Sequence, residues 1–110
     1  MSNPLDFIMQ QAQKMQSDMG KVEESLASKE LVAEAGAGLV RIVINGRGQV
    51  KSISIDDELL KEEKSVLEDL LVAATNESTN KTEKFRQEQL SGLASGIDLQ
   101  QFFNMKSNNS

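Results

Sequence analysis

A chain of 110 residues with a formal net charge of −5 is long enough for one domain and too short for two ordinary ones. It contains neither Cys nor His, which excludes disulfides, thiolate nucleophiles, Ser-His-Asp triads and zinc sites built on these ligands. Because His, the usual group for proton transfer near neutral pH, is missing, we expect no enzyme, no cofactor, no metal and no small-molecule substrate.

The acidic charge of the chain is concentrated in one stretch. Residues 56–69 carry a net charge of −5, while residues 29–55 carry +2 and the remainder is close to neutral. The overall sign argues against a nucleic-acid partner, although a local basic surface remains compatible with one. No apolar run is long enough to cross a membrane and no leader pattern is visible, so we expect a cytoplasmic protein without a membrane partner.

Residues 4–27 carry the pattern of an amphipathic helix. Asn3 and Pro4 suit its start, because Asn can cap free N–H groups and Pro loses no hydrogen bond at the first helical position. Apolar residues then recur at alternating spacings of three and four, which are the a and d positions of three heptads. So narrow a stripe suits a helix packed on its own domain and a seam against a second helix about equally. The candidate dimer seam consists of Leu5, Ile8, Ala12, Met15, Met19, Val22 and Leu26.

Three short strands are predicted next, at about residues 30–35, 39–45 and 49–55. In the second strand every other residue is apolar, so that one face of it is wholly apolar, while the other face carries both apolar and charged residues. Asn45-Gly46-Arg47-Gly48 is a strong hairpin turn, because Asn and Gly tolerate the positive φ that such turns need. Tight turns between short strands predict an antiparallel meander, and the helical segments must cover its apolar face.

The helical period returns after the third strand, and we predict a second helix over about residues 57–93. Its first part has the broad apolar face of a helix that lies on a sheet. Residues 75–82 read TNESTNKT and contain no large apolar side chain. We interpret this part as an arm that projects beyond the body of the domain. Residues 97–110 are predicted to form a polar, flexible tail, which leaves a single domain over residues 1–96.

The acidic stretch and the basic residues each allow a structural and a functional interpretation. The carboxylates of residues 56–69 lack the spacing of a calcium loop, and negative charge at a helix start interacts favourably with the dipole, so we predict no metal site. Lys81, Lys84 and, less squarely, Arg86 fall on part of one helix face. A solvated polar face is the ordinary interpretation of such residues, and a phosphate-binding face is the alternative.

Two runs of sequence, together with the order of the elements, carry a resemblance to a known family. The runs are EAGAGLVRIVING at residues 34–46 and LEDLLVAATN at residues 67–76, and QAQKMQ at residues 11–16 is similar too. They resemble the YbaB/EbfC family of bacterial nucleoid-associated proteins from about Leu5 to Ser95. The resemblance implies a tweezer-like homodimer, with the sheets at its centre and helical arms that hold duplex DNA largely independently of sequence.

Two functions therefore remain open for this predicted α+β fold. The first is that of a nucleoid-associated homodimer whose arms contact the phosphate backbone of duplex DNA and which affects chromosome organisation and gene expression. The second is a protein-interaction module that uses the heptad stripe and the acidic helix start, which the net charge of −5 favours. The family has no sharp motif for its DNA contacts, so the candidates rest on their positions on the two arm helices. These DNA-binding candidates are Lys14, Lys21, Lys81, Lys84 and Arg86.

Overall fold

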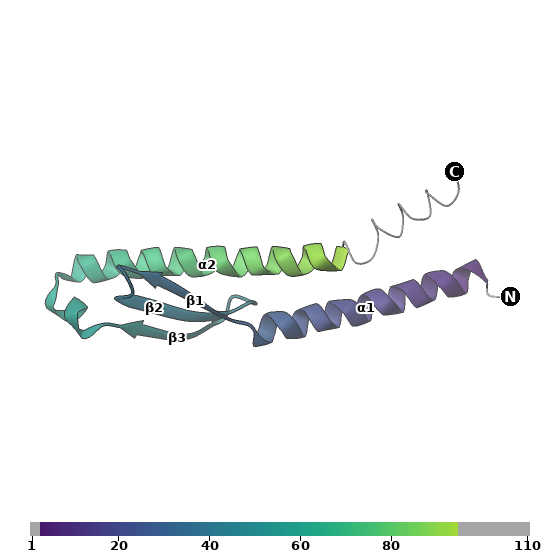
Figure 1. Cartoon of the computed structure of the whole chain (residues 1–110), viewed down its shortest axis with the longest axis horizontal. Coiled ribbons are helices and arrows are strands. Elements are labelled where there is room, and N and C mark those ends of the chain that lie inside the picture. The colour runs from purple at the N-terminus through teal and green to yellow at the C-terminus, as the bar shows by residue number, and fades with distance from the viewer. Residues whose placement is uncertain (1–2, 95–110) are drawn as a thin grey trace.

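The computed structural model describes residues 3–94 of the chain as a helix, a three-stranded sheet and a second, longer helix (Figure 1). This order confirms the predicted α+β fold. The expected tail, residues 97–110, and the predicted domain end at residue 96 lie outside the described residues. The elements are α1 (Pro4–Ser28), β1 (Glu30–Ala35), β2 (Val40–Asn45), β3 (Val50–Ile55), a 3-10 turn η1 (Asp57–Lys61) and α2 (Lys64–Ala94).

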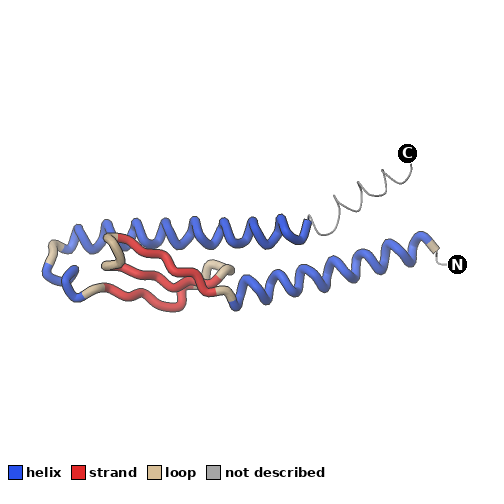
Figure 2. The backbone as a smooth tube through the Cα atoms, viewed as in Figure 1, coloured by secondary structure: helices blue, strands red, loops and turns tan. Residues whose placement is uncertain are grey.

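The strands form an antiparallel meander in the order β1-β2-β3 (Figure 2). The β2–β3 hairpin is built around Asn45, whose side-chain oxygen accepts hydrogen bonds from the backbone N–H of Arg47 at 3.0 Å and of Gln49 at 2.9 Å. Gly48 in this turn has a φ of 85°, a conformation that a residue with a Cβ adopts only with strain. The predicted hairpin turn is therefore confirmed.

The core lies between α2 and two of the three strands. Val40, Ile42 and Ile44 point from one face of β2 towards α2, as the alternation in the sequence predicts, and all three are buried. Ala33 of β1, Leu59 of η1 and Ala74 of α2 complete this cluster. Because α2 runs over β1 and β2, the outer strand β3 has only its pairing with β2 to hold it, and all six of its residues are exposed.

The polar segment 75–82 does not project as an arm, and this prediction was wrong. It packs on the sheet, with Ser78 only 2% exposed and Thr82 also buried. The Ser78 hydroxyl donates to the Thr75 carbonyl at 2.7 Å and the Thr82 hydroxyl donates to the Asn45 carbonyl at 3.4 Å, so neither polar group is left unpaired. Small side chains at these positions let the helix backbone approach the hairpin closely, which a large apolar residue would prevent.

The second helix also begins later than predicted. Residues 57–61 form the separate turn η1, which Asp56 caps by accepting a hydrogen bond from the backbone N–H of Glu58 at 2.9 Å. Extended backbone at Glu62 follows, and α2 starts at Lys64. A separate short turn allows Leu59 to enter the core from the end of the sheet, which a continuous helix from residue 57 would not permit.

The helix α1 extends away from the sheet, past the described end of α2 (Figure 1). The radius of gyration is 21.5 Å, against about 13 Å for a compact domain of this length. The base of α1 is held at the hairpin, where the Asn45 side-chain amide donates to the Ala27 carbonyl at 3.3 Å. A Cβ on Gly46 would lie 2.8 Å from both the Leu26 carbonyl oxygen and the Phe85 ring, so this junction accepts glycine only.

Candidate nucleic-acid interface

Three lysines gather at the outer edge of β1. The Lys81 ammonium donates to the Val32 carbonyl at 2.6 Å, which fixes that side chain against the strand. The Lys29 ammonium lies 5.6 Å from the centre of the Phe85 ring, within the range of a cation–π contact. Lys84 lines the same hollow, together with one acid, Glu88. We call Lys29, Lys81 and Lys84 the β1-edge patch; with Glu88 it carries a local net charge of about +2.

Arg86 lies on the other flank of α2, so the expected common face of Lys81, Lys84 and Arg86 is wrong. Arg86 comes five positions after Lys81 in the helix, which is a rotation of about 140°. Arg86 lines two hollows that it shares with Arg47 of the hairpin. Arg47 lies 4.0 Å from the Glu23 carboxylate, and both side chains are about half exposed. Glu83 also lines this side, so the local charge here is balanced rather than basic.

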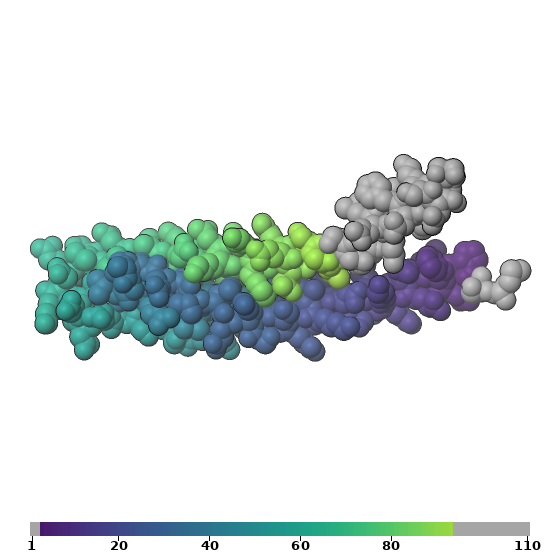
Figure 3. All heavy atoms as spheres, in the orientation of Figure 1, coloured from purple at the N-terminus to yellow at the C-terminus, as the bar shows by residue number. Residues whose placement is uncertain are grey.

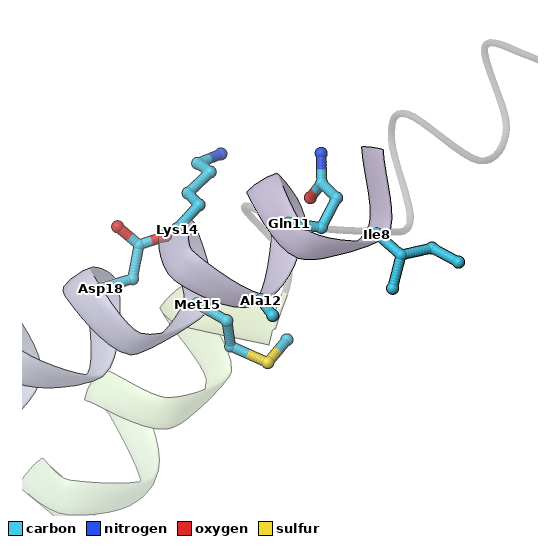
Figure 4. A pocket seen from close by; sticks show the side chains of 6 residues that line it. All are labelled: Ile8, Gln11, Ala12, Lys14, Met15 and Asp18. Atoms are coloured by element: carbon cyan, nitrogen blue, oxygen red, sulfur yellow. The ribbon is translucent and has the colours of Figure 1, made fainter. Parts of the chain in front are cut away.

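Lys14 and Lys21 lie on one flank of α1, seven residues apart. Both are exposed, and neither forms a hydrogen bond or an ion pair with any of residues 3–94. In Figure 4, the Lys14 side chain extends to the same side of α1 as Gln11 and Asp18, away from Ala12 and Met15. Both lysines are therefore free to meet an anionic partner alongside the projecting helix.

The acidic stretch lies at the far end of the molecule from α1. It comprises η1 and the start of α2, and Figure 1 places it beyond the sheet from the N-terminus. From Asp69, the last acid of the stretch, to Lys81 the helical rise alone amounts to about 18 Å. At physiological salt, charges separated by more than about 8 Å of solvent are largely screened from one another. The net charge of −5 therefore does not describe the surface that the lysines form.

Sequence reasoning found two lysines of the β1-edge patch and missed the third. Lys29 follows α1 directly, where its backbone N–H donates to the Ser25 carbonyl, so from the sequence it is only the end of a helix. It joins the patch because Phe85 lies 56 residues later and returns to the same place in the fold. The signal for Lys29 is its contact with an aromatic ring, and this contact is visible only in the tertiary structure.

Other kinds of site find little support among the described residues. Residues 3–94 hold no cluster of three or more carboxylates able to bind a metal ion. In the same part of the chain, neither helix is both long and apolar enough to pass through a lipid bilayer.

An apolar surface on the sheet is also open. Val50, Ile53 and Ile55 of β3 lie opposite the buried residues of β2, on the face that α2 covers elsewhere, yet they are 53%, 51% and 38% exposed. Leu60 of η1, beside them in the chain, is 68% exposed. A single copy of this fold leaves this surface, the β3 face, against water.

The heptad stripe of α1 divides into two parts. Val22 and Leu26 are buried within the chain, so they are not available to a second helix as the sequence had suggested. Leu5, Ile8 and Met15 are 58%, 61% and 49% exposed. The seam is therefore intramolecular at the base of α1 and uncovered by any described residue towards its start.

Known proteins resemble this chain in sequence and in fold. The model of the YbaB/EbfC DNA-binding family matches residues 1–97. The chain is 42% identical over 105 residues to "Nucleoid-associated protein MCA1327" of Methylococcus capsulatus, which covers 96% of this chain and 98% of that protein. The crystal structure of the uncharacterized protein HP0035 from Helicobacter pylori is similar with a TM-score of 0.75, at 22% identity, and covers 84% of this chain and 99% of that one. At this identity the structural likeness concerns the fold alone.

Proposed function

The chain belongs to the YbaB/EbfC DNA-binding family, and from this premise we propose that it is a nucleoid-associated protein that binds duplex DNA without sequence preference, as a homodimer. In this proposal it acts at the nucleoid, on chromosome organisation and gene expression. The family match confirms the resemblance expected from residues 34–46 and 67–76. The observation that carries the proposal is the separation of the β1-edge patch and the α1 lysines from the acidic stretch.

Contact with phosphates rather than bases follows from the chemistry of the candidates. Lys14, Lys21 and Lys84 are exposed lysines, and an ammonium on a flexible stem acts as a point charge. Base recognition usually relies on planar, bidentate groups such as Arg or Asn held at a groove. Phosphate contacts carry no sequence information, so binding by these lysines is expected to be similar on every duplex.

The β3 face is our proposed dimer interface. This apolar surface continues directly from the core, and Val50, Ile53 and Ile55 would complete that core if a second copy covered them. A two-fold axis at this face brings the same strand of each copy together, as closed dimers require. The two sheets would then lie at the centre and each α1 would extend outwards.

The dimer is tested by Ile53→Lys, which places a charge in the proposed interface. Light scattering at low micromolar concentration should give about twice 12.1 kDa for the native protein and a smaller mass for the variant. Ser52→Lys, on the opposite face of the same strand, should leave the mass unchanged. A native monomer, or equal masses for the two variants, would contradict the proposed interface.

Duplex binding is tested by gel-shift titration on several unrelated duplexes at low and moderate salt. We expect similar affinities for all of them, with two to five phosphates neutralised, which corresponds to a log–log salt slope of roughly −2 to −5. A preference for one duplex, or affinity indifferent to salt, would contradict phosphate binding by these lysines. A protein that retains no duplex at low salt would favour the protein-interaction module instead.

A further inference from the structure

The start of α1 carries an apolar stripe that no described residue covers. Leu5, Ile8 and Met15 are exposed, and the start of α1 extends past the described end of α2 (Figure 1). Ile8, Ala12 and Met15 line a hollow of about 270 Å³ along the helix, together with Gln11, Lys14 and Asp18. In Figure 4, Ala12 and Met15 turn to the side of α1 opposite to Lys14. An apolar strip of this kind on a projecting helix points to a packing partner outside the described residues.

The same stripe already has a partner at its other end. Leu90 of α2 lines one hollow together with Met19, Val22 and Leu26, so α2 lies beside this part of the stripe. The two helices run antiparallel, since α1 leads into the sheet and α2 leads back along it (Figure 1). The end of α2 at Ala94 therefore lies towards the uncovered part of the stripe.

The length of the following chain fits the uncovered part. From Met19 to Leu5 the rise along α1 is about 21 Å. Sixteen residues follow Ala94 in the sequence, and they reach about 24 Å at the rise of a helix and farther if extended. The apolar residues that this segment offers to the stripe are Ile97, Leu99, Phe102, Phe103 and Met105.

We propose that residues 95–110 dock on the uncovered stripe of α1 in the same chain, with Phe102 or Phe103 in the hollow between Ile8 and Met15. A segment tethered at Ala94 reaches the stripe at an effective concentration in the millimolar range, which a second copy at micromolar concentration does not match. Lys14 also lines this hollow, so docking brings the segment beside Lys14 and leaves Lys21, seven residues on, open. This docking requires neither DNA binding nor the dimer at the β3 face.

Disulfide trapping tests this docking directly, because the native chain has no Cys. The variant Ile8→Cys with Phe102→Cys should form a disulfide readily under mild oxidation, since docking brings the two Cα atoms to within about 7 Å. The matched control, Gln10→Cys with Phe102→Cys, places its first thiol on the opposite side of α1 and should form far less. A non-reducing gel should show the product at the mass of one chain.

Two outcomes of the trapping would overturn the proposal. Equal trapping in the control would mean that the segment contacts α1 without preference. A product at the mass of two chains would mean that the occupant comes from another copy.

Amide hydrogen exchange provides a second measurement that does not need new cysteines. Replacing Phe102 and Phe103 by Ser should speed exchange of residues 8–15 by about tenfold, while residues 22–26 keep their rate because α2 still covers them. The matched variant Gln100→Ser with Gln101→Ser should leave both regions unchanged. Unaltered exchange at residues 8–15 in the Phe variant would contradict docking.

Discussion

Apolar residues are usually buried and polar residues exposed, but the middle of α2 and the start of α1 show the opposite. Residues 75–82 of α2 are polar throughout, yet Ser78 and Thr82 are among the most buried side chains. Residues 5–15 of α1 carry Leu, Phe, Ile and Met at close spacing, yet these side chains face water. Burial in α2 is set by how closely the helix approaches the hairpin, which requires small side chains. Exposure in α1 indicates a surface whose partner lies outside the described residues.

The first test of this contrast changes Gly46, where the hairpin lies closest to the two helices. Gly46→Ala should lower the free energy of unfolding by about 3 kcal/mol, because the new Cβ overlaps the Leu26 carbonyl and the Phe85 ring. Urea unfolding measures the change. If the loss is below about 0.5 kcal/mol, the hairpin and the two helices are not in tight contact, and the burial of Ser78 needs another explanation.

A second test compares the two ends of the α1 stripe with one substitution. Val22→Lys should cost about 2 kcal/mol, because Val22 is 8% exposed and a charge there must be desolvated or force the helices apart. Met15→Lys should cost at most about 1 kcal/mol, since Met15 is half exposed and its replacement can reach water. Gln13→Lys is the control on an exposed position.

Thermal unfolding of these three variants ranks the positions. A cost for Met15→Lys equal to that for Val22→Lys would show that the start of α1 is as deeply packed as its base. A cost indistinguishable from that of Gln13→Lys would instead leave the start of α1 without a packing partner.

How much of this arrangement was predictable from the sequence depends on the range of the interactions. The strands, the turn at Asn45-Gly46 and the start of α1 at Asn3 depend on neighbouring residues, and all of them were predicted. The burial of Ser78 was not, because it depends on a helix and a hairpin that meet only in the folded chain. The division of Lys84 and Arg86 between two flanks also needs the position of the sheet under α2.

The third test asks whether the lysines on the exposed flank of α2 bind DNA. Lys81→Glu with Lys84→Glu should weaken binding to every duplex by about tenfold at low salt, or about 1.4 kcal/mol, and reduce the salt slope by about 1 or more. Gel-shift titration at several salt concentrations measures both quantities.

The matched control for this test is Lys61→Glu with Lys64→Glu. It makes the same change in net charge within the acidic stretch, at the other end of the molecule. Figure 3 shows the start of α2 at one end of the elongated surface and its later part (green) farther along it. Equal weakening by both pairs of substitutions would mean that overall charge, and not the β1-edge patch, governs binding.

The smallest expected effect concerns Gly20, in the middle of α1. Apart from its chain neighbours and the adjoining helix backbone, no atom lies within 4 Å of the place where its Cβ would be, and its backbone is helical, so neither contact nor conformation requires glycine there. Gly20→Ala should raise the free energy of unfolding by about 0.5 to 1 kcal/mol, because Ala restricts the unfolded chain and favours the helix. Chemical denaturation should be measured for Gly20→Ala and Gly46→Ala together. The same added methyl group is expected to stabilise the exposed helix at Gly20 and to destabilise the close junction at Gly46. A destabilising effect at Gly20 would show that the side of α1 around this residue is covered in the native protein.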